Sequence, residues 1–485
     1  MKLAEYADHD ALGLAGLVAR GEVSAREVTD CARRAMDALD PQLNAIVLRM
    51  DGYADDLLAA GLPHAALRGA PLVLKDEYQF APGVPTQHGA RISRGFGLPR
   101  KTELLRRFEA AGLVPVGKSN LPEFGASVTC EPVANGICRN PWDLGRTSGA
   151  SSAGSAAAVA AGMVPVGYAN DGAGSIRIPA SCCGLFGLKP TRGRNPTGPY
   201  AGEMWNGLVI EHVLTRSVRD SAAVLDATAG ADAGAPYAAP AQLRPYLQEV
   251  GAPPGRLRIG VSLQPPAGGS ADPACVEAAQ AAARLCESLG HHVDLAQPPH
   301  DAQALQDAIG QLLAVHLAYG IDELSRATGI VARPDNVERC NWLLAERARR
   351  MPAPGLLGVL AVFNEASRSA AAFWDDHDLW LTPTLGRLPV PHGHITPLLD
   401  EPDEYLRRWF DFCPFTALAN ATGSPSMSVP LHMATLPSAP PLPVGVCFTA
   451  QPGGEAVLLR LASQLEAAAP WRDRHPPASA WNLGN

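Results

Sequence analysis

The stretch from Thr147 to Arg192 constrains this chain more than any other part of its sequence. Two clusters of small residues stand on either side of an Ala/Val run, and both contain serine: Gly149–Ser155 and Asp171–Ser175. Glycine lets backbone N–H groups turn inward, and successive inward N–H groups form a concave site for an anion. A serine directly after such a run can address the same carbonyl group as those N–H groups. The alternative is a glycine-rich loop that only lets two elements pack closely, and the repeated pairing with serine argues against it.

This stretch resembles the signature of the amidase signature hydrolases, which use a Ser–cis-Ser–Lys triad. The resemblance places the nucleophile on Ser175 and the bridging cis-peptide serine on Ser151, and the spacing of the two serines matches the family's. The chain departs from the pattern at Gly172 and Ala173, where Thr or Ile and then Gly are usual, and at Ala153, where glycine is common. Because oxyanion donors are backbone N–H groups, these exchanges alter the stiffness of the loop more than its chemistry.

The third member of the triad has few candidates, because the chain contains only five lysines. Residues 69–75 read Gly-Ala-Pro-Leu-Val-Leu-Lys, which predicts a buried strand that ends at Lys75. A strand-end lysine that reaches solvent is the ordinary alternative. However, the G-x-P-x-x-x-K-D pattern resembles the family's lysine segment, and burial among apolar neighbours favours loss of the lysine proton. We therefore expect Lys75 to be a neutral general base.

The resemblance implies hydrolysis of a carbon–nitrogen acyl bond. Lys75 takes a proton from Ser151, which takes one from Ser175, and Ser175 attacks the carbonyl carbon. Ser151 then protonates the leaving nitrogen, and water releases the acyl group. No metal, cofactor or nucleotide is expected.

Further residues of the signature are expected to support this chemistry. Asp171 and Arg177 brace the nucleophile loop by charge-assisted hydrogen bonds, and Ser152 is a third supporting residue. The expected donors to the oxyanion are the backbone N–H groups of Gly172, Ala173, Gly174 and Ser175.

One motif is a false match. Residues 112–119 formally satisfy G-x-x-x-x-G-K-[ST], the phosphate-binding loop. That motif should follow a strand and open a helix, whereas here a predicted helix precedes it and Leu-Val-Pro-Val resembles a buried strand. The segment from Lys118 to Phe124 instead resembles the family's G-K-[ST]-N-x-x-E-[FM] segment near the active site.

The predicted fold class is α/β, the amidase signature fold, with a large mixed β-sheet flanked by helices on both faces. Length alone permits either two domains or one large unit, and the resemblance favours a single amidase domain over 1–485. Its core is expected at 1–230 and 410–470, with a variable substrate-pocket region at about 257–405. Within that region, residues from about 297 to 400, which include aromatic residues and His316, are expected to line the substrate pocket.

Residue patterns predict individual elements along the chain. Helical periodicity runs through 10–38 with a break at Gly21-Glu22, after which Ser24 and Glu27 form a capping box. Further helices are predicted at 54–60, 102–111 and 458–466. Strands are predicted at 44–48, 69–75, 113–118, 258–262 and 380–384.

Charge and cysteine usage limit the partners and the compartment. A net charge of −8 gives no electrostatic footprint for nucleic acid or an anionic membrane. The N-terminus is too acidic for a signal peptide, and no apolar run is long enough to span a bilayer. The ten cysteines form no C-x-x-C pair, and Cys182 and Cys183 are adjacent, so neither zinc nor an iron–sulfur cluster is indicated. We expect reduced thiols and a cytoplasmic monomer or homodimer.

Several alternatives remain. A Ser-His-Asp hydrolase lacks its G-x-S-x-G motif, and a β-lactamase-type site lacks S-x-x-K. A glutaminase subunit of a tRNA amidotransferase would carry a segment that residues 364–370 do not continue. A non-catalytic ligand-binding relative would be expected to lose part of the triad. The residue pattern of the signature most resembles the branch of the family that contains hydrolases of cyclic nylon oligomers. Aryl-acylamidases and urethane-cleaving members are the other candidates. The expected substrate is a small amide or carbamate.

Overall fold

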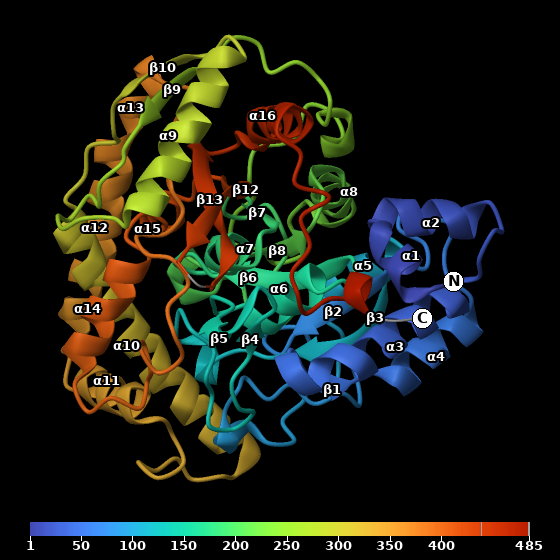
Figure 1. Cartoon of the computed structure of the whole chain (residues 1–485). Coiled ribbons are helices and arrows are strands. Elements are labelled where there is room, and N and C mark those ends of the chain that lie inside the picture. Colours follow the sequence, from blue (N-terminus) through green and yellow to red (C-terminus); the bar gives the residue numbers. More distant parts are fainter. Residues whose placement is uncertain (438, 484–485) are drawn as a thin grey trace.

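An eleven-stranded mixed sheet runs through the middle of the protein in the computed structural model, which describes residues 1–437 and 439–483 (Figure 1). The order across the sheet is β1-β3-β2-β6-β8-β7-β12-β13-β11-β9-β10. Its strands are β1 (Ile46–Arg49), β2 (Pro71–Lys75), β3 (Val114–Ser119), β6 (Val166–Asp171), β7 (Phe186–Lys189), β8 (Ile210–Thr215), β9 (Arg258–Val261), β10 (His292–Leu295), β11 (Leu379–Pro383), β12 (Ser426–Leu436) and β13 (Ala439–Ala450). A separate pair consists of β4 (Arg139–Asn140) and β5 (Asp143–Thr147).

Strand β1 lies antiparallel to β3 at one edge. The rest of the sheet is parallel on either side of an antiparallel centre. Strand β2 lies parallel to β3 and to β6, and β9 lies parallel to β10 and to β11. Between these groups, β8, β7, β12 and β13 pair antiparallel. The long β12–β13 hairpin therefore joins strands from the first half of the chain to strands from the second half.

Helices cover both faces of this sheet. They are α1 (Leu3–Asp8), α2 (Ala11–Ala19), α3 (Ala25–Leu43), α4 (Asp51–Ala60), α5 (Glu103–Ala110), α6 (Ala153–Ala160), α7 (Arg177–Cys183), α8 (Val218–Thr228), α9 (Pro273–Ser288), α10 (Ala302–Thr328), α11 (Arg339–Arg349), α12 (Ala353–Ala371), α13 (Phe373–Asp376), α14 (Pro402–Phe412), α15 (Ala417–Ala421) and α16 (Glu455–Ala468).

Strand β12 shows how the two faces are filled. Successive side chains of a strand point to opposite faces. Ser426 accordingly accepts a hydrogen bond from Arg177 of α7, whereas Met427 belongs to the hydrophobic cluster that contains α8, α9 and α16. The predicted fold class, a large mixed sheet with helices on both faces, is confirmed.

Helix α6 explains the small residues before it and within it. All eight of its residues are buried, and it lies against β6, β2 and β3. A Cβ atom on Gly154 would collide with the backbone of Ala45 and Asn120, so only glycine permits this approach. The close-packing interpretation of the first cluster is therefore correct for Gly154, and it does not conflict with a catalytic role for a neighbouring serine.

Most of the predicted elements are present, with boundaries shifted by a few residues. The capping box is confirmed, since Ser24 Oγ accepts from Glu27 N at 3.2 Å and Glu27 Oε2 accepts from Ser24 N at 2.7 Å. The helix that follows runs on to Leu43 rather than ending near residue 38. Residues 114–119 form the buried strand β3, and Lys118 Nζ donates to Gln79 O at 2.6 Å. The rejection of a phosphate-binding loop is therefore confirmed.

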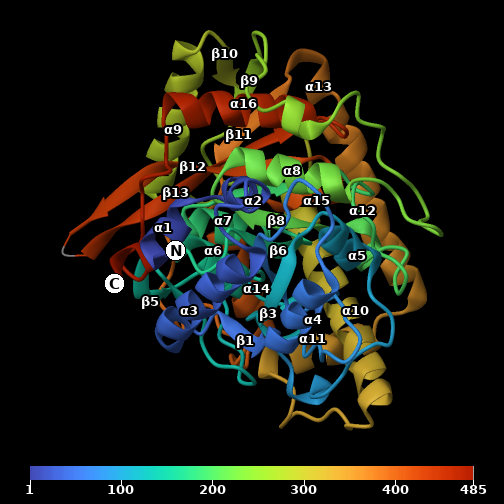
Figure 2. The same ribbon diagram turned by 90° about the vertical axis from the view of Figure 1, so that its right-hand side faces the viewer.

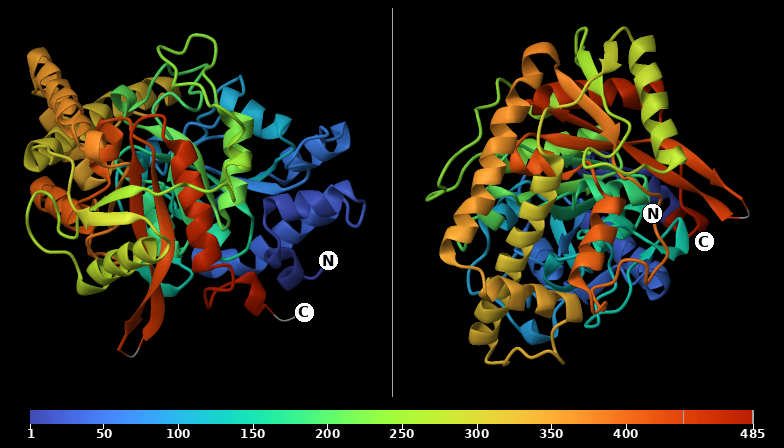
Figure 3. Two further views of the ribbon diagram at one scale, coloured as in Figure 1. Left: turned by 90° about the horizontal axis from the view of Figure 1, so that it is seen from above. Right: turned by 90° about the vertical axis from the view of Figure 1, so that its left-hand side faces the viewer.

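The segment between β10 and β12 adds a helical layer at one side of the sheet. Helices α10, α11, α12 and α14 gather there, with their axes visible side by side in the right-hand view of Figure 3. At the opposite side α1 lies next to residues 480–482, where Trp481 Nε1 donates to Asp8 Oδ1 at 2.8 Å (Figure 2). Among the described helices, none combines the length and the apolar character that crossing a bilayer requires.

Candidate active site

Both serines of the signature line one small cavity at the end of the strands β2 and β6. Ser151 lies just before α6, and the peptide bond that joins it to Ala150 is cis. Ser175 lies in the turn between β6 and α7 and is partly exposed. The structure therefore brings together the two serines that the sequence pairs.

Lys75 reaches this site from the end of β2. Its side chain is completely buried, so the alternative of a lysine that reaches solvent is wrong. Its Nζ lies 2.7 Å from Ser151 Oγ and 2.6 Å from Asn170 Oδ1. The Ser151 hydroxyl is thus within hydrogen-bonding distance of the amine, as proton transfer between them requires.

Two partners of Lys75 were not predicted from the sequence. Glu77 Oε2 lies 2.9 Å from Lys75 Nζ, and Asn170 Nδ2 donates to the same carboxylate oxygen at 3.2 Å. Asn170 could have been found, because it lies near the carboxyl end of β6, which runs parallel to β2 and so delivers side chains to the same edge. Glu77 depends on a turn in which Tyr78 adopts a φ of 58°, for which the sequence carries no signal.

Asp171 organises the loop that carries the nucleophile. Its Oδ1 accepts from Gly174 N at 2.7 Å, and its Oδ2 accepts from Ile176 N at 3.2 Å. Arg177 donates to both carboxylate oxygens at 2.9 Å. Burial raises the pKa of Asp171, but the Arg177 charge and hydrogen bonds outweigh it and lower this pKa to about 2. These contacts provide the bracing that was predicted for Asp171 and Arg177.

The same contacts correct one member of the predicted oxyanion set. The N–H of Gly174 is directed to the Asp171 carboxylate, so it is not free to bind an oxyanion. Gly174 has a structural role instead: its φ is 137°, and a Cβ atom would collide with Thr416 and Ile178. Three N–H groups remain as candidate donors, those of Gly172, Ala173 and Ser175.

Residues from the C-terminal part of the chain support this loop from behind. Asn420 Nδ2 donates to Asp171 O at 2.8 Å, and Arg177 Nη2 donates to Asn420 Oδ1 at 2.6 Å. Thr416 Oγ1 donates to Ala173 O at 2.5 Å. Ser152 Oγ donates to Asn170 O at 3.3 Å, which ties the start of α6 to β6. Ser152 was expected to support the loop, whereas the contacts that Thr416 and Asn420 make with it were not predicted from the sequence.

Aromatic residues dominate the walls of the cavity. Five large side chains line it: Tyr78, Phe124, Trp205, Val209 and Trp409. Tyr78 and Phe124 both adopt a positive φ, which bulky residues seldom do without support from their surroundings. Among the described residues that line the cavity, Glu77 carries the only charged side chain. The site therefore suits a neutral, apolar or flat group.

The expected contribution from residues 297–400 differs from the observed one. No described residue of that segment lines the cavity with Ser175. His316 lies behind the wall, stacked on Trp205 with ring centroids 5.8 Å apart, and it pairs with Asn206 at 3.0 Å. Burial lowers the pKa of His316 to about 4, so its ring is neutral at pH 7. Phe363 and Phe373 of the same segment pack instead in a hydrophobic cluster with residues of α10, α12 and α15.

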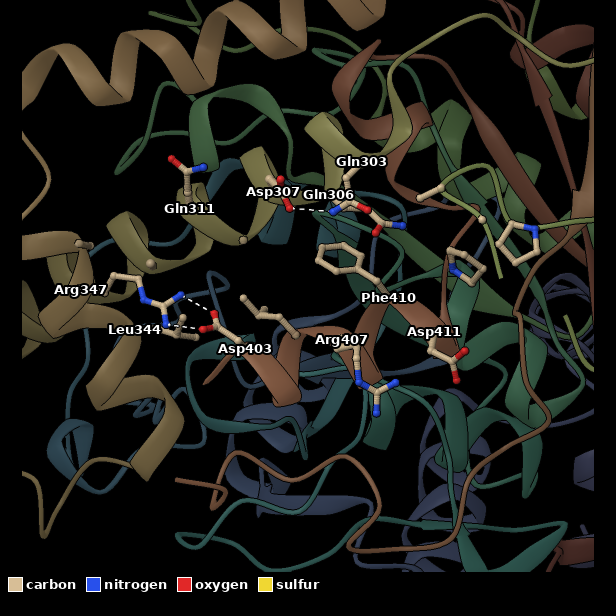
Figure 4. A pocket seen from close by; sticks show the side chains of 18 of the residues that line it. Gln303, Gln306, Asp307, Gln311, Leu344, Arg347, Asp403, Arg407, Phe410 and Asp411 are labelled. Carbon is tan, nitrogen blue, oxygen red and sulfur yellow. Dashed lines mark hydrogen bonds and ion pairs between the residues drawn. The ribbon is translucent and has the colours of Figure 1, made fainter. Parts of the chain in front are cut away.

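A second cavity, of about 510 Å³, lies on the other side of α14 (Figure 4). The side chains from α10, α11 and α14 that line it include ion pairs and hydrogen bonds among themselves, such as Arg347 with Asp403 at 2.7 Å and Gln303 with Asp307 at 2.9 Å. None of the triad residues lines this cavity. Helix α14 thus separates it from the site at Ser175, with Phe410 on one side and Trp409 on the other.

Comparisons with known proteins agree with this geometry. A family model described as Amidase matches residues 27–459. The protein belongs to the amidase signature family. The 6-aminohexanoate-cyclic-dimer hydrolase of Paenarthrobacter ureafaciens is 36% identical over 483 residues, which cover 96% of each chain. A solved structure of a 6-aminohexanoate cyclic dimer hydrolase in complex with substrate has a TM-score of 0.92 at 34% identity, and the match covers 97% of this chain and 99% of that one.

The fold is shared more widely than the sequence. A bacterial aryl acylamidase has a TM-score of 0.88 at 24% identity, covering 98% of this amidase and 99% of that chain. The protein is an amidase, a hydrolase that acts on carbon–nitrogen amide bonds, as the matching family model and the related hydrolases indicate.

All ten cysteines of the protein are free and buried, including Cys182 and Cys183.

Proposed function

We propose that this amidase cleaves small, neutral, largely apolar amides through an acyl-enzyme on Ser175. The observation that carries the proposal is the distance of 2.7 Å between Lys75 Nζ and Ser151 Oγ, in a cavity that Ser151 and Ser175 share. Lys75 accepts a proton from Ser151, and Ser151 accepts one from Ser175 as that hydroxyl attacks the carbonyl carbon. The N–H groups of Gly172, Ala173 and Ser175 are the candidate donors to the oxyanion.

The second half of the reaction uses the same groups in reverse. Ser151 returns a proton to the leaving nitrogen, the carbon–nitrogen bond breaks, and the amine departs while the acyl group stays on Ser175. Water then attacks the ester carbonyl and gives a proton to the Ser151–Lys75 pair. The pair returns a proton to Ser175 Oγ as the ester carbon–oxygen bond breaks, and a carboxylic acid is released. Asp171, Arg177 and Ser152 hold the loop and the start of α6 in position.

Cyclic diamides, anilides and aryl carbamates are the substrates that we propose. The names of the relatives support the cyclic amide and the anilide, and the aromatic walls suit the flat groups of all three. Glutamine fits less well, because its charged amino acid end would face walls on which Glu77 is the only charged group described. The protein is proposed to act as a monomer or homodimer without a partner subunit.

Trapping of the acyl-enzyme tests the proposal. Purified protein is mixed with an activated anilide or carbamate, quenched, digested and analysed by mass spectrometry. The expected result is an acyl adduct on Ser175, and a serine-directed fluorophosphonate should label the same residue. Labelling of another residue, together with full amide turnover by Ser175→Ala, would overturn the assignment. Hydrolysis of glutamine alone, and only with added partner subunits, would contradict the substrate class.

A further inference from the structure

The indole N–H of Trp409 is a buried hydrogen-bond donor without a partner. Trp409 lies on α14, is 4% exposed, and its Nε1 makes no hydrogen bond within the part of the chain that the structure describes. The residue lines the same cavity as Ser151 and Ser175. A buried N–H group that loses its bond to water is costly unless another acceptor replaces it.

Other buried tryptophans of this protein do have a hydrogen-bond acceptor for the indole N–H. Trp142 donates its indole N–H to Cys183 O at 2.9 Å, Trp380 donates to Ser262 Oγ at 2.9 Å, and Trp471 donates to Arg216 O at 2.8 Å. Each of these residues is as buried as Trp409 or nearly so, and none of them lines the cavity. Trp409 thus differs from these three residues in having no acceptor for its indole N–H among the described residues. It also lines the cavity in which a substrate could supply that acceptor.

The neighbouring turn of α14 gives a second contrast. Tyr405 lies one helical turn before Trp409 on the same inward face, and the two rings meet edge to face at 6.0 Å. Its hydroxyl donates to Ala126 O at 2.7 Å. The side chains of Tyr405 and Trp409 are therefore buried side by side. In the part of the chain that the structure describes, the protein supplies a hydrogen-bond acceptor only for Tyr405, which does not line the cavity.

We propose that Trp409 Nε1 binds a second acceptor group of the substrate, distinct from the carbonyl that Ser175 attacks. The walls otherwise consist of aromatic and aliphatic groups, with the serines, Asn170, Glu77 and the backbone of the nucleophile loop on the reacting side. A largely apolar substrate with one further carbonyl oxygen would match the apolar walls and would also accept the hydrogen bond from Trp409 Nε1. This inference rests on the proposed function and defines its substrate class as amides that carry a second carbonyl, as a cyclic diamide does.

The test compares matched substrates in matched variants. Acyl p-nitroanilides with a ketone at successive positions along the acyl chain are each compared with the all-methylene parent, in the wild type, Trp409→Phe and Trp380→Phe. Phenylalanine keeps a flat apolar ring but has no N–H. Trp380 is the control, because its N–H is bonded to Ser262 and it lies outside the cavity lining.

We expect the wild type to prefer one ketone position over the parent by roughly three- to tenfold in kcat/KM, the range of a single neutral hydrogen bond. Trp409→Phe should remove that preference, and Trp380→Phe should keep it. A preference that survives in Trp409→Phe, or that is absent for every ketone position in the wild type, would overturn the proposal.

Binding separates this inference from the catalytic proposal. The same series is titrated calorimetrically into Ser175→Ala and into Ser175→Ala/Trp409→Phe, in which no turnover is needed. If the ketone preference appears in binding but wild-type protein forms no acyl-enzyme, the proposed reaction fails and the recognition role stands. If acylation of Ser175 is observed without any ketone preference, the recognition role fails and the reaction stands. Should Trp409→Phe be unstable, the absence of any ketone preference in the wild type and in Ser175→Ala would still overturn the proposal.

Discussion

The carboxylate of Glu77 lies 2.9 Å from the Nζ of Lys75, in a site where both side chains are almost completely buried. Lys75 Nζ also lies 2.7 Å from Ser151 Oγ and 2.6 Å from Asn170 Oδ1. Glu77 therefore helps to hold the amine that we propose as the general base against the serine that gives it a proton.

Replacement of Glu77 by glutamine tests that role. The amide oxygen can still accept a hydrogen bond, but the negative charge beside Lys75 is lost, and a hydrogen bond between charged groups is stronger than a neutral one. We expect Glu77→Gln to lower kcat/KM by about tenfold, the equivalent of about 1.4 kcal/mol. Initial rates on a stable anilide measure this, with Glu401→Gln, an exposed carboxyl group, as the control. An unchanged kcat/KM would show that Glu77 does not position Lys75.

The variant Lys75→Arg distinguishes two roles of Lys75, a general base and a fixed positive charge. Arginine keeps a positive charge and much of the bulk, but it does not deprotonate in the working range. If Lys75 accepts the proton of Ser151, Lys75→Arg and Lys75→Ala should both lose about 10²–10⁴-fold in kcat/KM. Circular dichroism and thermal unfolding establish that the variants are folded. Near-native turnover of a stable amide by Lys75→Arg would mean that Lys75 only supplies charge or structure.

The ion pair between Asp171 and Arg177 is predicted to matter for stability as well as for activity. Both side chains are fully buried, and Arg177 also reaches Thr416 O at 2.8 Å. Removal of one partner leaves a buried charge unpaired. Arg177→Met should therefore lower the free energy of unfolding by about 3–5 kcal/mol, as measured by urea denaturation. A loss below about 1 kcal/mol would show that the pair does not hold the loop.

The signature could be predicted from the sequence because its constraints are local. Glycines with positive φ or close backbone contacts, such as Gly174 and Gly154, leave a readable pattern, and so does a lysine at the end of an apolar strand. Sequence patterns also placed most helices and strands, since hydrophobic periodicity reflects which face is buried. What these patterns share is that few residues, close together along the chain, determine the outcome.

The partners of the signature could not be predicted, because they depend on contacts between distant segments. Asn420 lies far along the chain from Asp171, and Trp409 reaches the cavity only because α14 packs across it. We expected residues from about 297 to 400 to line the substrate pocket. None of the described residues of that segment lines the cavity at Ser175, for a related reason. Aromatic residues there indicate burial, but Phe363 and Phe373 pack in a hydrophobic cluster with residues of α10, α12 and α15, and the sequence does not distinguish a core from a pocket.

Glu211 is a carboxyl group that should make the stability of this amidase fall as pH rises. It lies on β8, opposite Asn170 of β6, and is 3% exposed. Its Oε1 accepts from Tyr168 Oη at 2.6 Å and from Gln79 Nε2 at 3.0 Å, while its Oε2 has no partner among the described residues. Burial raises the pKa of Glu211 to about 8, although these two hydrogen bonds lower it.

The sign of the effect follows from proton linkage. An unfolded glutamate has a pKa of about 4.3, so between about pH 4.3 and 8 the folded protein keeps a proton that the unfolded chain has lost. Stability from this group is therefore complete below about pH 4.3 and falls as pH rises toward 8. In Glu211→Gln the proton cannot be lost, and the hydrogen bonds from Tyr168 and Gln79 can still reach an amide oxygen.

We expect Glu211→Gln to flatten the decline of unfolding free energy between pH 5 and 8, by at least about 1.4 kcal/mol, the equivalent of one pKa unit. Urea unfolding at several pH values measures the slope, and Glu401→Gln, an exposed carboxyl group, serves as the control. Parallel slopes for Glu211→Gln and the wild type would show that Glu211 is ionised in the folded protein. In that case the hydrogen bonds from Tyr168 and Gln79 would outweigh the effect of burial on Glu211.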